Sequence, residues 1–315
     1  MGADDRVTIG LPAYNEERAL PRALQSLEDQ RFPANTRFRV IVAANGCTDR
    51  TVEVGREFGL ARGAAAVEIE NGQARCWRFD CPRYELWICE LPQASKGLAL
   101  RFIHEQAAGD VVIVLDSDAW FADGDAVRLL CEALAGHPDH GASAPVVAGR
   151  IAPFDRAANP VAEVARILVS RAVNAFDAYR PRLDGRGYAY RKRVVPELPG
   201  LIAIDLWLEA TVHERSAGCV YVAGARLEYQ LPRTWRDLVR QYVRYDRTIR
   251  DLRAGHPRAL SSIREARAGA RRAAPWWFVL HRGIGWLFLH WIALAARGHV
   301  YQEDRPWEVI ESTKA

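Results

Sequence analysis

Two carboxylates, Asp116 and Asp118, follow directly on the apolar run Val111–Leu115. Five unbroken aliphatic residues predict a strand that is buried on both faces, and in α/β proteins ligands collect beyond the carboxyl ends of such strands. Residues i and i+2 point to one side, so both carboxylates can face one hard cation such as Mg²⁺ or Mn²⁺, which keeps substrate phosphates among its ligands. The pattern predicts a metal-diphosphate site. The alternative is that the two residues cap a helix that starts near Asp123.

Polar loops also follow two earlier predicted strands. The strand Val7–Leu11 runs into the loop Pro12–Glu17, and the strand Arg37–Ala44 runs into the loop Asn45–Asp49. Neither loop has the G-x-G-x-x-G pattern that brings backbone amides close to a dinucleotide pyrophosphate, which argues against a dehydrogenase of the Rossmann type.

Strands and helices alternate along the first half of the chain, and this alternation predicts an α/β fold with a largely parallel sheet in three layers. A helix is expected from Lys96 to Ala108, and residues beyond Pro160 have a helix-rich pattern. We expect one catalytic domain over residues 1–252, with a donor-binding half at about 1–120 and an acceptor-side half at about 121–252. Residues 253–315 are expected to form a helical extension.

Bulk properties exclude some classes of function. A net charge of +4 over 315 residues gives no field that argues for nucleic-acid binding. The six cysteines lack a paired framework and the N-terminus lacks a signal-peptide pattern, so reduced thiols and a cytoplasmic location are expected. Cys76, Cys81 and Cys89 match no common zinc spacing and are expected to be buried or incidental thiols.

The segment Trp276–Ala296 is apolar and rich in tryptophan, and several arginines precede it. This composition suits a helix that lies in a membrane interface, with arginines at anionic headgroups and indoles at the boundary. Residues 264–296 are therefore expected to make a peripheral contact with the inner face of the cytoplasmic membrane, or else to pack on the catalytic domain or form a homodimer contact.

Taken together, PAYNEE, NGCTD, the Lys-Gly pair before a helix and DSD occur in an order that resembles an inverting family 2 glycosyltransferase of the GT-A fold. The resemblance covers about residues 6–250. It implies that Asp116 and Asp118 hold Mg²⁺ or Mn²⁺ on the diphosphate, with the second as the direct ligand in many members. It also implies a nucleotide-sugar site lined by Pro12, Ala13, Tyr14, Glu16, Asn45, Asp49, Lys96 and Asp116.

The acidic segment Ile204–Glu209 resembles the family's catalytic motif, with isoleucine in place of the first acid. The resemblance implies that Asp205 is the base that takes the acceptor proton, with Glu209 one turn further as the reserve candidate. The alternative for Asp205 is an N-cap of this helix. A second departure is Ala44-Asn45, where many members have an acidic pair. A carboxylate that would accept the imide proton of the nucleobase is therefore missing, and Asn45 or backbone groups would replace it.

Gln241–Tyr245 resembles the family's Q-x-x-R-W motif, with tyrosine for tryptophan. Gln241, Arg244 and Tyr245 would share one side of a helix, with Arg244 neutralising the leaving diphosphate and Tyr245 packing on sugar or acceptor. The alternative is an exposed basic helix face. The glycine-containing loop Gly185–Arg191 resembles the family's acceptor-side segment.

The sequence thus predicts a metal-dependent inverting glycosyltransferase that moves a sugar from a nucleotide-diphosphate sugar to an acceptor hydroxyl by a single displacement. A processive enzyme would need several membrane-spanning helices to extrude its polymer, and the sequence gives no convincing pattern for them. A non-processive enzyme is therefore expected. The acceptor is left open between a glycan, a lipid-linked intermediate and a natural product. The alternative function is a catalytically inactive nucleotide-sugar-binding or membrane-associated scaffold; a pyrophosphorylase is disfavoured because PAYNEE lacks its glycine- and arginine-rich loop.

Overall fold

The structure is a computed structural model of the chain. It describes residues 6–34, 36–63, 67–70, 74–137, 141–143, 183, 185–195, 197–199, 204–214, 218–229, 250, 252–254 and 261. The predicted site residues Gln241, Arg244 and Tyr245 lie outside these ranges, as do the segment 264–296 and most of the predicted 253–315 extension.

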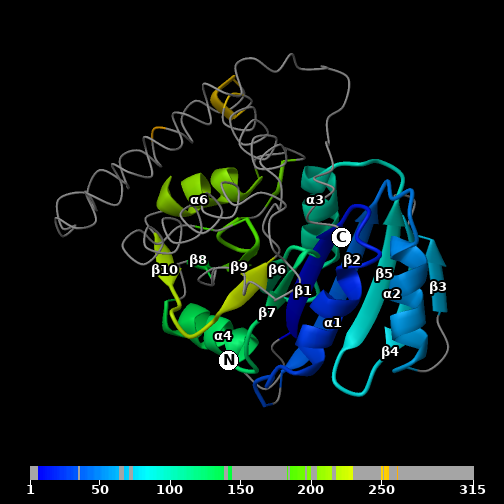
Figure 1. Cartoon of the computed structure of the whole chain (residues 1–315). Helices are drawn as coiled ribbons and strands as arrows, with labels where there is room; N and C mark the ends of the chain where they lie inside the picture. The colour runs from blue at the N-terminus through cyan, green and yellow to red at the C-terminus, as the bar shows by residue number, and fades with distance from the viewer. Residues whose placement is uncertain are drawn as a thin grey trace, which may run out of the picture.

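The described residues form an α/β fold, as predicted (Figure 1). The helices are α1 (Leu20–Glu28), α2 (Thr51–Leu60), α3 (Lys96–Gln106), α4 (Ala126–Gly136) and α6 (Ile204–Glu214). The strands are β1 (Arg6–Ala13), β2 (Arg37–Asn45), β3 (Val67–Glu70), β4 (Arg75–Asp80), β5 (Glu85–Leu91), β6 (Val111–Leu115), β7 (Ala119–Phe121), β8 (Gly141–Ser143), β9 (Gly187–Arg191), β10 (Cys219–Tyr221) and β11 (Leu227–Tyr229).

Four parallel strands form the centre of the main sheet, in the order β6-β1-β2-β5. All of β6 is buried, and in β1 only Arg6 is exposed, because helices cover both faces of the sheet. Helix α3 lies so close to β1 that a Cβ atom added to Gly10 would meet Ile103 Cγ2 at 2.3 Å. The strands of this centre therefore end at one common edge, where the polar loops begin.

Antiparallel strands flank the parallel centre. On one side β9 pairs with β6 and with β8, and on the other β4 pairs with β5 and with β3. Residues 187–191, which we expected to belong to a loop, form β9. Between Cys219 and Tyr229 the chain forms the two strands β10 and β11, because it turns at Ala225, whose N–H donates to the carbonyl of Val222. The strand β11 pairs with β7 in a separate small sheet.

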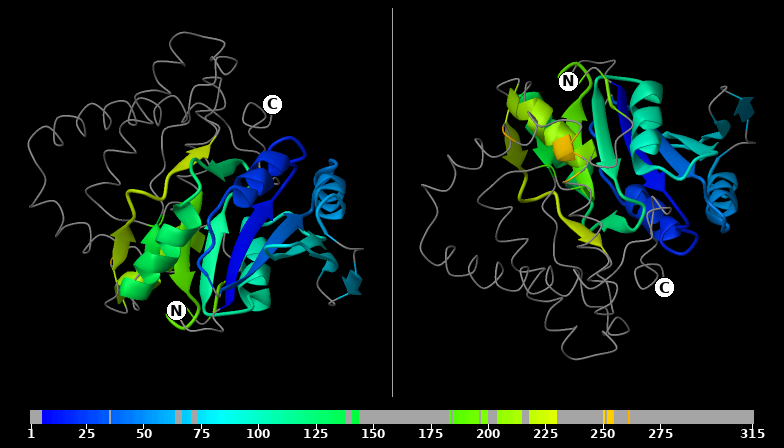
Figure 2. Two further views of the ribbon diagram at one scale, coloured as in Figure 1. Left: turned by 90° about the horizontal axis from the view of Figure 1, so that it is seen from below. Right: turned by 90° about the horizontal axis from the view of Figure 1, so that it is seen from above.

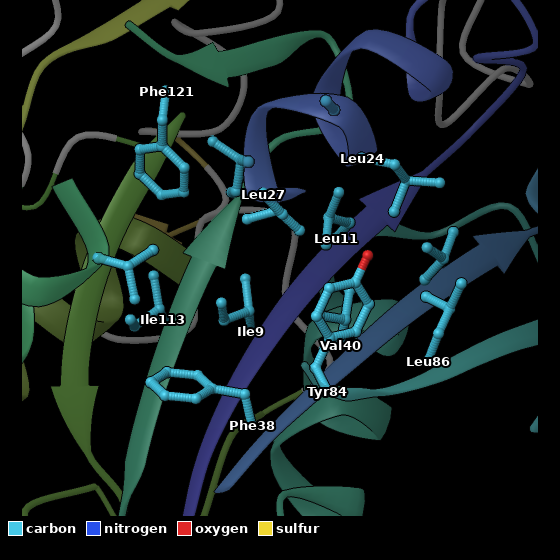
Figure 3. Close-up of a cluster of buried hydrophobic side chains, with 14 of the residues drawn as sticks. Ile9, Leu11, Leu24, Leu27, Phe38, Val40, Tyr84, Leu86, Ile113 and Phe121 are labelled. Carbon is cyan, nitrogen blue, oxygen red and sulfur yellow. The ribbon is translucent and has the colours of Figure 1, made fainter. Parts of the chain in front are cut away.

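Two apolar cores lie on opposite faces of the sheet, which gives the predicted three layers (Figure 2). Helices α1, α2 and α4 cover one face, and α3 and α6 cover the other. Figure 3 shows the first core, in which leucines of α1 meet alternate side chains of β1 and β2. No helix among the described residues has the length and apolar character needed to cross a membrane.

The cysteine prediction was wrong for two of the six residues. Cys76 of β4 and Cys89 of β5 form a disulfide bond, and both are buried. The register of these antiparallel strands places the two residues directly opposite each other. The register of one strand against another is not visible in the sequence, so this pairing could not be foreseen. The expectation of a cytoplasmic location, which rested on reduced thiols, loses that support.

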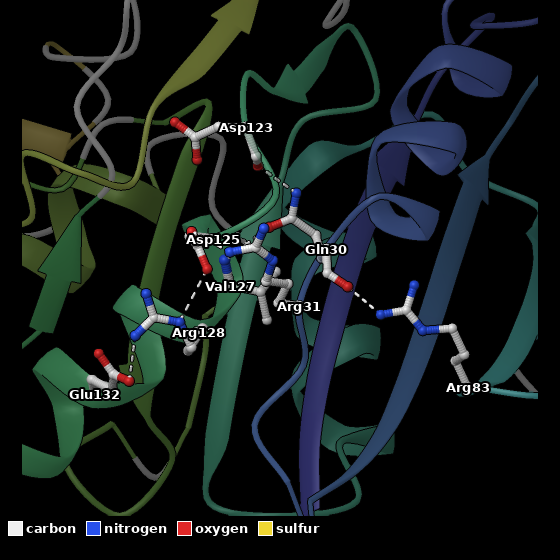
Figure 4. A network of polar contacts seen from close by, with 8 residues as sticks. All are labelled: Gln30, Arg31, Arg83, Asp123, Asp125, Val127, Arg128 and Glu132. Carbon is white, nitrogen blue, oxygen red and sulfur yellow. Dashed lines mark hydrogen bonds and ion pairs between the residues drawn. The ribbon is translucent and has the colours of Figure 1, made fainter.

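A buried glutamine fixes the chain that follows the DSD motif onto α1 (Figure 4). Gln30 is 1% exposed, donates to the carbonyls of Ser26 (3.1 Å) and Asp123 (2.7 Å), and accepts from the backbone N–H of Val127 (3.1 Å). The last contact occupies an N–H in the first turn of α4, which otherwise has no partner within the helix. Gln30 thus holds both the start of α4 and the segment leading to it.

We expect Gln30→Met to lower the free energy of unfolding by about 1–3 kcal/mol, because it leaves buried donors and acceptors without partners. Urea unfolding followed by circular dichroism measures the change. The control is Arg31→Met, whose side chain is 77% exposed in its ion pair with Asp125 and should change stability by less than about 1 kcal/mol. Equal effects of the two substitutions would contradict the role given to Gln30.

Candidate functional site

Three loops meet at the carboxyl edge of the central strands. Ser117, the middle residue of DSD, donates its hydroxyl to the carbonyl of Pro12 at 2.9 Å. Asn45, at the end of β2, donates its side-chain amide to the carbonyl of Ala13 at 2.6 Å. The three motifs that the sequence placed at strand ends are therefore joined by short contacts. Pro12 and Ala13 take part through their backbone carbonyls.

A second set of contacts clamps the loop after β1 to the loop after β2. Asn15 accepts the backbone N–H of Thr48 at 2.8 Å and donates to the Thr48 hydroxyl at 3.2 Å. Asp49 accepts the backbone N–H groups of Glu17 (3.2 Å) and Thr51 (3.0 Å). Asn15 has a left-handed backbone with φ 54°, which is uncommon outside glycine but tolerated by asparagine. Asp49 thus has a structural role in the described residues, at the start of α2.

The predicted donor residues differ in how accessible they are. Asn45 is 1% exposed and Glu16 is 7% exposed, whereas Tyr14 is half-buried. The side-chain oxygen of Asn45 is buried and has no hydrogen-bond partner in the described structure. A hydrogen-bond acceptor is what the imide N–H of a nucleobase would need.

The centre of the site is an ion pair between α3 and the DSD motif. Lys96, the first residue of α3, lies with its Nζ atom 2.7 Å from Asp116 Oδ2 and 2.5 Å from Oδ1. The same Nζ donates to the carbonyl of Gly185 at 3.1 Å. Burial raises the pKa of Asp116 to about 6, Lys96 opposes this rise, and the carboxylate of Asp118 adds to it.

The alternative role for Asp116 and Asp118, as caps of α4, is excluded by the structure. Helix α4 begins at Ala126, its N-cap residue is Asp125, and strand β7 lies between it and DSD. Lys96 contacts both oxygens of Asp116, whereas the Asp118 side chain makes no hydrogen bond or ion pair with any described residue. Asp118 is thus the carboxylate that a cation could take directly.

The residues fit a Mg²⁺ or Mn²⁺ ion that a substrate helps to hold. The described residues contain no group of three histidine, cysteine or acidic side chains arranged to bind a metal. Proteins usually bind Mg²⁺ through one or two carboxylates, and water and phosphate oxygens occupy its other coordination positions. The two carboxylates therefore suit a cation that is bound together with a diphosphate.

The predicted base, Asp205, lies on the other side of Gly185 from the Lys96–Asp116 ion pair. A Cβ atom added to Gly185 would meet Asp205 Oδ2 at 2.9 Å, and the carbonyl of Gly185 is the one that Lys96 binds. The backbone N–H of Asp116 donates to the carbonyl of Arg186 at 2.8 Å. Residues 185 and 186 thus connect Asp205 to Asp116, although 89 residues separate the two carboxylates in the sequence.

The two candidate bases on α6 have different surroundings. Asp205 lies in the first turn of the helix, after Ile204, and is half-buried. Glu209 is 1% exposed and lies 4.0 Å from His213 Nε2. A base must reach the proton that it takes, so the accessible Asp205 is the better candidate. A carboxylate in a first turn also interacts favourably with the helix dipole.

The structure adds two residues that motif reasoning did not assign. Arg186 accepts the backbone N–H of Asp116 through its carbonyl, and its guanidinium carbon lies 3.8 Å from the centre of the Tyr229 ring. Tyr188 of β9 is buried, its hydroxyl has no hydrogen-bond partner in the described structure, and burial raises its pKa well above the ordinary value. Asp205 and Asp116 are both close enough to add to that rise. Both residues lie in the segment Gly185–Arg191, which was expected to be an acceptor-side loop.

The described arrangement can hold a phosphorylated ligand near an accessible base. It offers one amine, two carboxylates and a half-buried carboxylate at the edge of a rigid sheet. These groups suit transfer chemistry in which a diphosphate leaves while a nearby group loses a proton.

Comparison with known proteins agrees with this arrangement. Residues 8–63 match the sequence model of the family described as Glycosyl transferase family 2. The chain is 31% identical over 67 residues to Glycosyltransferase AglE of Haloferax volcanii, which is 21% of this chain and 22% of that protein. It is 25% identical over 133 residues to the undecaprenyl-phosphate 4-deoxy-4-formamido-L-arabinose transferase of Pseudomonas aeruginosa, which is 42% of this chain and 34% of that protein. The chain therefore covers about a third or less of the length of these relatives.

Among solved structures, the mannosyltransferase PcManGT of Pyrobaculum calidifontis, in complex with GDP-Man and Mn²⁺, has a similar fold. The TM-score is 0.54 at 17% sequence identity, and the match covers 92% of this chain and 85% of that one. The predicted resemblance is therefore confirmed: the chain carries the glycosyl transferase family 2 sequence at residues 8–63, within a fold of the GT-A type.

Proposed function

We propose that this protein is a metal-dependent inverting glycosyltransferase that moves a sugar from a nucleotide-diphosphate sugar to an acceptor hydroxyl. The observation that carries the proposal is the meeting of Asp205 with the Lys96–Asp116 pair at Gly185. A single displacement needs a base and a leaving-group site on the two sides of one sugar, and the position of both groups against Gly185 supports this assignment. The reaction is non-processive in this proposal.

The loops after β1 and β2 bind the nucleotide, with the buried oxygen of Asn45 facing a donor group of the base. Lys96 and Asp118 lie at the diphosphate, with Lys96 as a fixed positive charge. A Mg²⁺ or Mn²⁺ ion held by Asp118 and Asp116 would supply charge stabilisation of the leaving diphosphate. Asp205 takes the proton of the attacking hydroxyl.

A phosphate oxygen is the second candidate acceptor. The similarity to a protein named as an undecaprenyl-phosphate transferase favours a lipid-linked phosphate. A phosphate monoester is already ionised near neutral pH, because its second pKa is about 6, so it needs no base. Dependence on Asp205 therefore separates a hydroxyl acceptor, whether a glycan or a natural product, from a phosphate acceptor.

The catalytic domain is proposed to extend over residues 1–252, with Gln241, Arg244 and Tyr245 adding to the site. Residues 264–296 are proposed as a peripheral contact with the inner face of the cytoplasmic membrane or as a homodimer contact. The location proposed for the protein is the cytoplasmic side of that membrane.

The competing proposal is an inactive nucleotide-sugar-binding scaffold, which the replacement of acids by Ala44 and Ile204 would favour. The accessible carboxylates Asp118 and Asp205 count against it, since a scaffold has no need for a base beside a diphosphate site. Release of free sugar from a panel of nucleotide sugars with Mn²⁺ separates the two proposals. The scaffold predicts no turnover with any donor.

We expect one nucleoside diphosphate to raise the melting temperature selectively when Mn²⁺ or Mg²⁺ is present. A ligand at about 100 times its dissociation constant adds about 2.7 kcal/mol of stability. Asp118→Asn should abolish the metal-dependent part of this stabilisation. The control is Asp125→Asn, because Asp125 pairs with Arg128 outside the site and should leave the response unchanged. An unchanged response in Asp118→Asn would remove Asp118 from the metal site.

We expect Asp205→Asn to lower transfer to a hydroxyl by about 10²–10⁴-fold while nucleotide affinity stays the same, because a general base acts in the transition state. Steady-state transfer and calorimetric binding of the nucleotide measure the two effects. The matched variant Glu209→Gln should retain most of the activity, since Glu209 is buried beside His213. Full transfer by Asp205→Asn would end its role as base and is the result that a phosphate acceptor predicts.

A further inference from the structure

Tyr188 is a buried tyrosine whose hydroxyl makes no hydrogen bond to any described residue. The side chain is 1% exposed and is among the largest fully buried side chains of the described chain. Its hydroxyl oxygen is itself buried and has no hydrogen-bond partner. A buried hydroxyl without a partner destabilises the folded state, because folding has removed its water. Packing alone therefore gives no reason for the hydroxyl, since phenylalanine would fill the same space.

The pleat of β9 directs Tyr188 toward the face of the sheet that carries α6. A Cβ atom added to Gly187, the preceding residue, would meet Leu227 Cδ1 at 2.1 Å, and Leu227 belongs to the core on the α1 side. Successive residues of a strand point to opposite faces, so Tyr188 enters the other core, together with Ile204 of α6. The ring thus lies in the layer beneath the helix that carries Asp205.

Two carboxylates of the site are neighbours of the Tyr188 hydroxyl. Val114, which pairs with Tyr188 across the strands, comes two residues before Asp116. Gly185, three residues before Tyr188, is the residue whose added Cβ atom would meet Asp205 Oδ2 at 2.9 Å. Burial is the main reason that the pKa of Tyr188 is raised well above its ordinary value, and the charges of Asp205 and Asp116 add to the rise. The hydroxyl therefore keeps its proton and can donate a hydrogen bond to a carboxylate.

Of the two carboxylates, Asp205 is the one that this donor suits. Lys96 Nζ already lies 2.7 Å from one oxygen of Asp116 and 2.5 Å from the other. A base, in contrast, needs one carboxylate oxygen to face the proton of the acceptor while the other is held in place. Hydrogen bonds of catalytic groups are often long in the free enzyme and shorten in the complex with substrate. A donor on the core side of α6 matches this requirement.

We propose that Tyr188 is a positioning residue, whose hydroxyl donates a hydrogen bond to one carboxylate oxygen of Asp205 during transfer. The bond keeps the other oxygen directed at the proton of the attacking hydroxyl. The proton of Tyr188 stays on Tyr188, and the proton of the acceptor moves to Asp205 as the bond from sugar to diphosphate breaks and the glycosidic bond forms. The inference rests on the proposed function, and it assigns a role to a residue that the family motifs leave without one.

The test compares two tyrosines on the same face of β9. Tyr188→Phe removes the hydroxyl and leaves the ring. The matched control is Tyr190→Phe, whose ring centroid lies 6.1 Å from that of Tyr188. The Tyr190 hydroxyl lies 3.0 Å from His104 Nδ1, in the last turn of α3. His104 is roughly 12 Å along the helix from Lys96, so this contact is away from the ion pair.

The first readout is the midpoint of urea unfolding. Tyr190→Phe should lower it, because the substitution removes a buried hydrogen bond to His104. Tyr188→Phe should leave it unchanged or raise it, because the hydroxyl that is removed has no partner among the described residues. A fall in Tyr188→Phe as large as that in Tyr190→Phe would show a structural role and overturn the proposal.

The second readout is steady-state release of free sugar by the full chain from UDP- and GDP-sugars with Mn²⁺. Water serves as the hydroxyl acceptor in this assay. Tyr188→Phe should lower kcat by about 10- to 100-fold, the usual size of a lost hydrogen bond to a charged group, with KM for the donor within about twofold of the wild type. Tyr190→Phe should keep both constants.

The third readout adds Tyr188→Phe to Asp205→Asn. If Tyr188 acts through Asp205, its substitution causes no further loss once Asp205 has been replaced. Losses that multiply would assign the hydroxyl to the substrate and overturn the positioning role. An unchanged kcat in Tyr188→Phe would also overturn it and leave the proposed function standing, whereas a wild type that turns over no donor would overturn both.

Discussion

The ion pair between Lys96 and Asp116 is the contact on which the site depends. Taking a carboxylate out of water costs several kcal/mol, and a partner close by in good geometry offsets that cost. Here the partner is the first residue of α3, so the pair depends on the packing of α3 on β1 and β2. The lysine also binds the carbonyl of Gly185, and the acceptor-side segment is thereby attached to the same charge centre.

The polar residues of the motifs divide into two groups by what they contact. Asn15, Ser117 and Asp49 bind other loops and hold the three strand ends together. Among the described residues Asp118 makes no such contact, and the side-chain oxygen of Asn45 is buried without a hydrogen-bond partner. The hydrogen bonds of Asn15, Ser117 and Asp49 hold the loops together and thereby keep Asp118 and Asn45 in position for a ligand.

The centre of the fold could be predicted from the sequence, whereas strands β4 and β9 could not. Parallel strands covered on both faces need continuous apolar sequence, so β1, β2 and β6 stand out in the chain. Strands β4 and β9 contain arginines and glycine and lie toward the margins of the sheet, where the apolar signal is weak. The disulfide between Cys76 and Cys89 was missed for the same reason, since it depends on the register of β4 against β5.

The sequence by itself determined that carboxylates and polar loops end the buried strands, because hydrophobic runs and turn residues are local patterns. It also placed Asp205 near the start of a helix. Only the tertiary structure decided that Asp205 meets Lys96 and Asp116 at Gly185, and that Arg186 lies against Tyr229 beside the DSD turn. Those contacts join residues that are far apart in the chain, and they follow from strand order and register, which are set by the packing of the whole sheet and not by any local pattern.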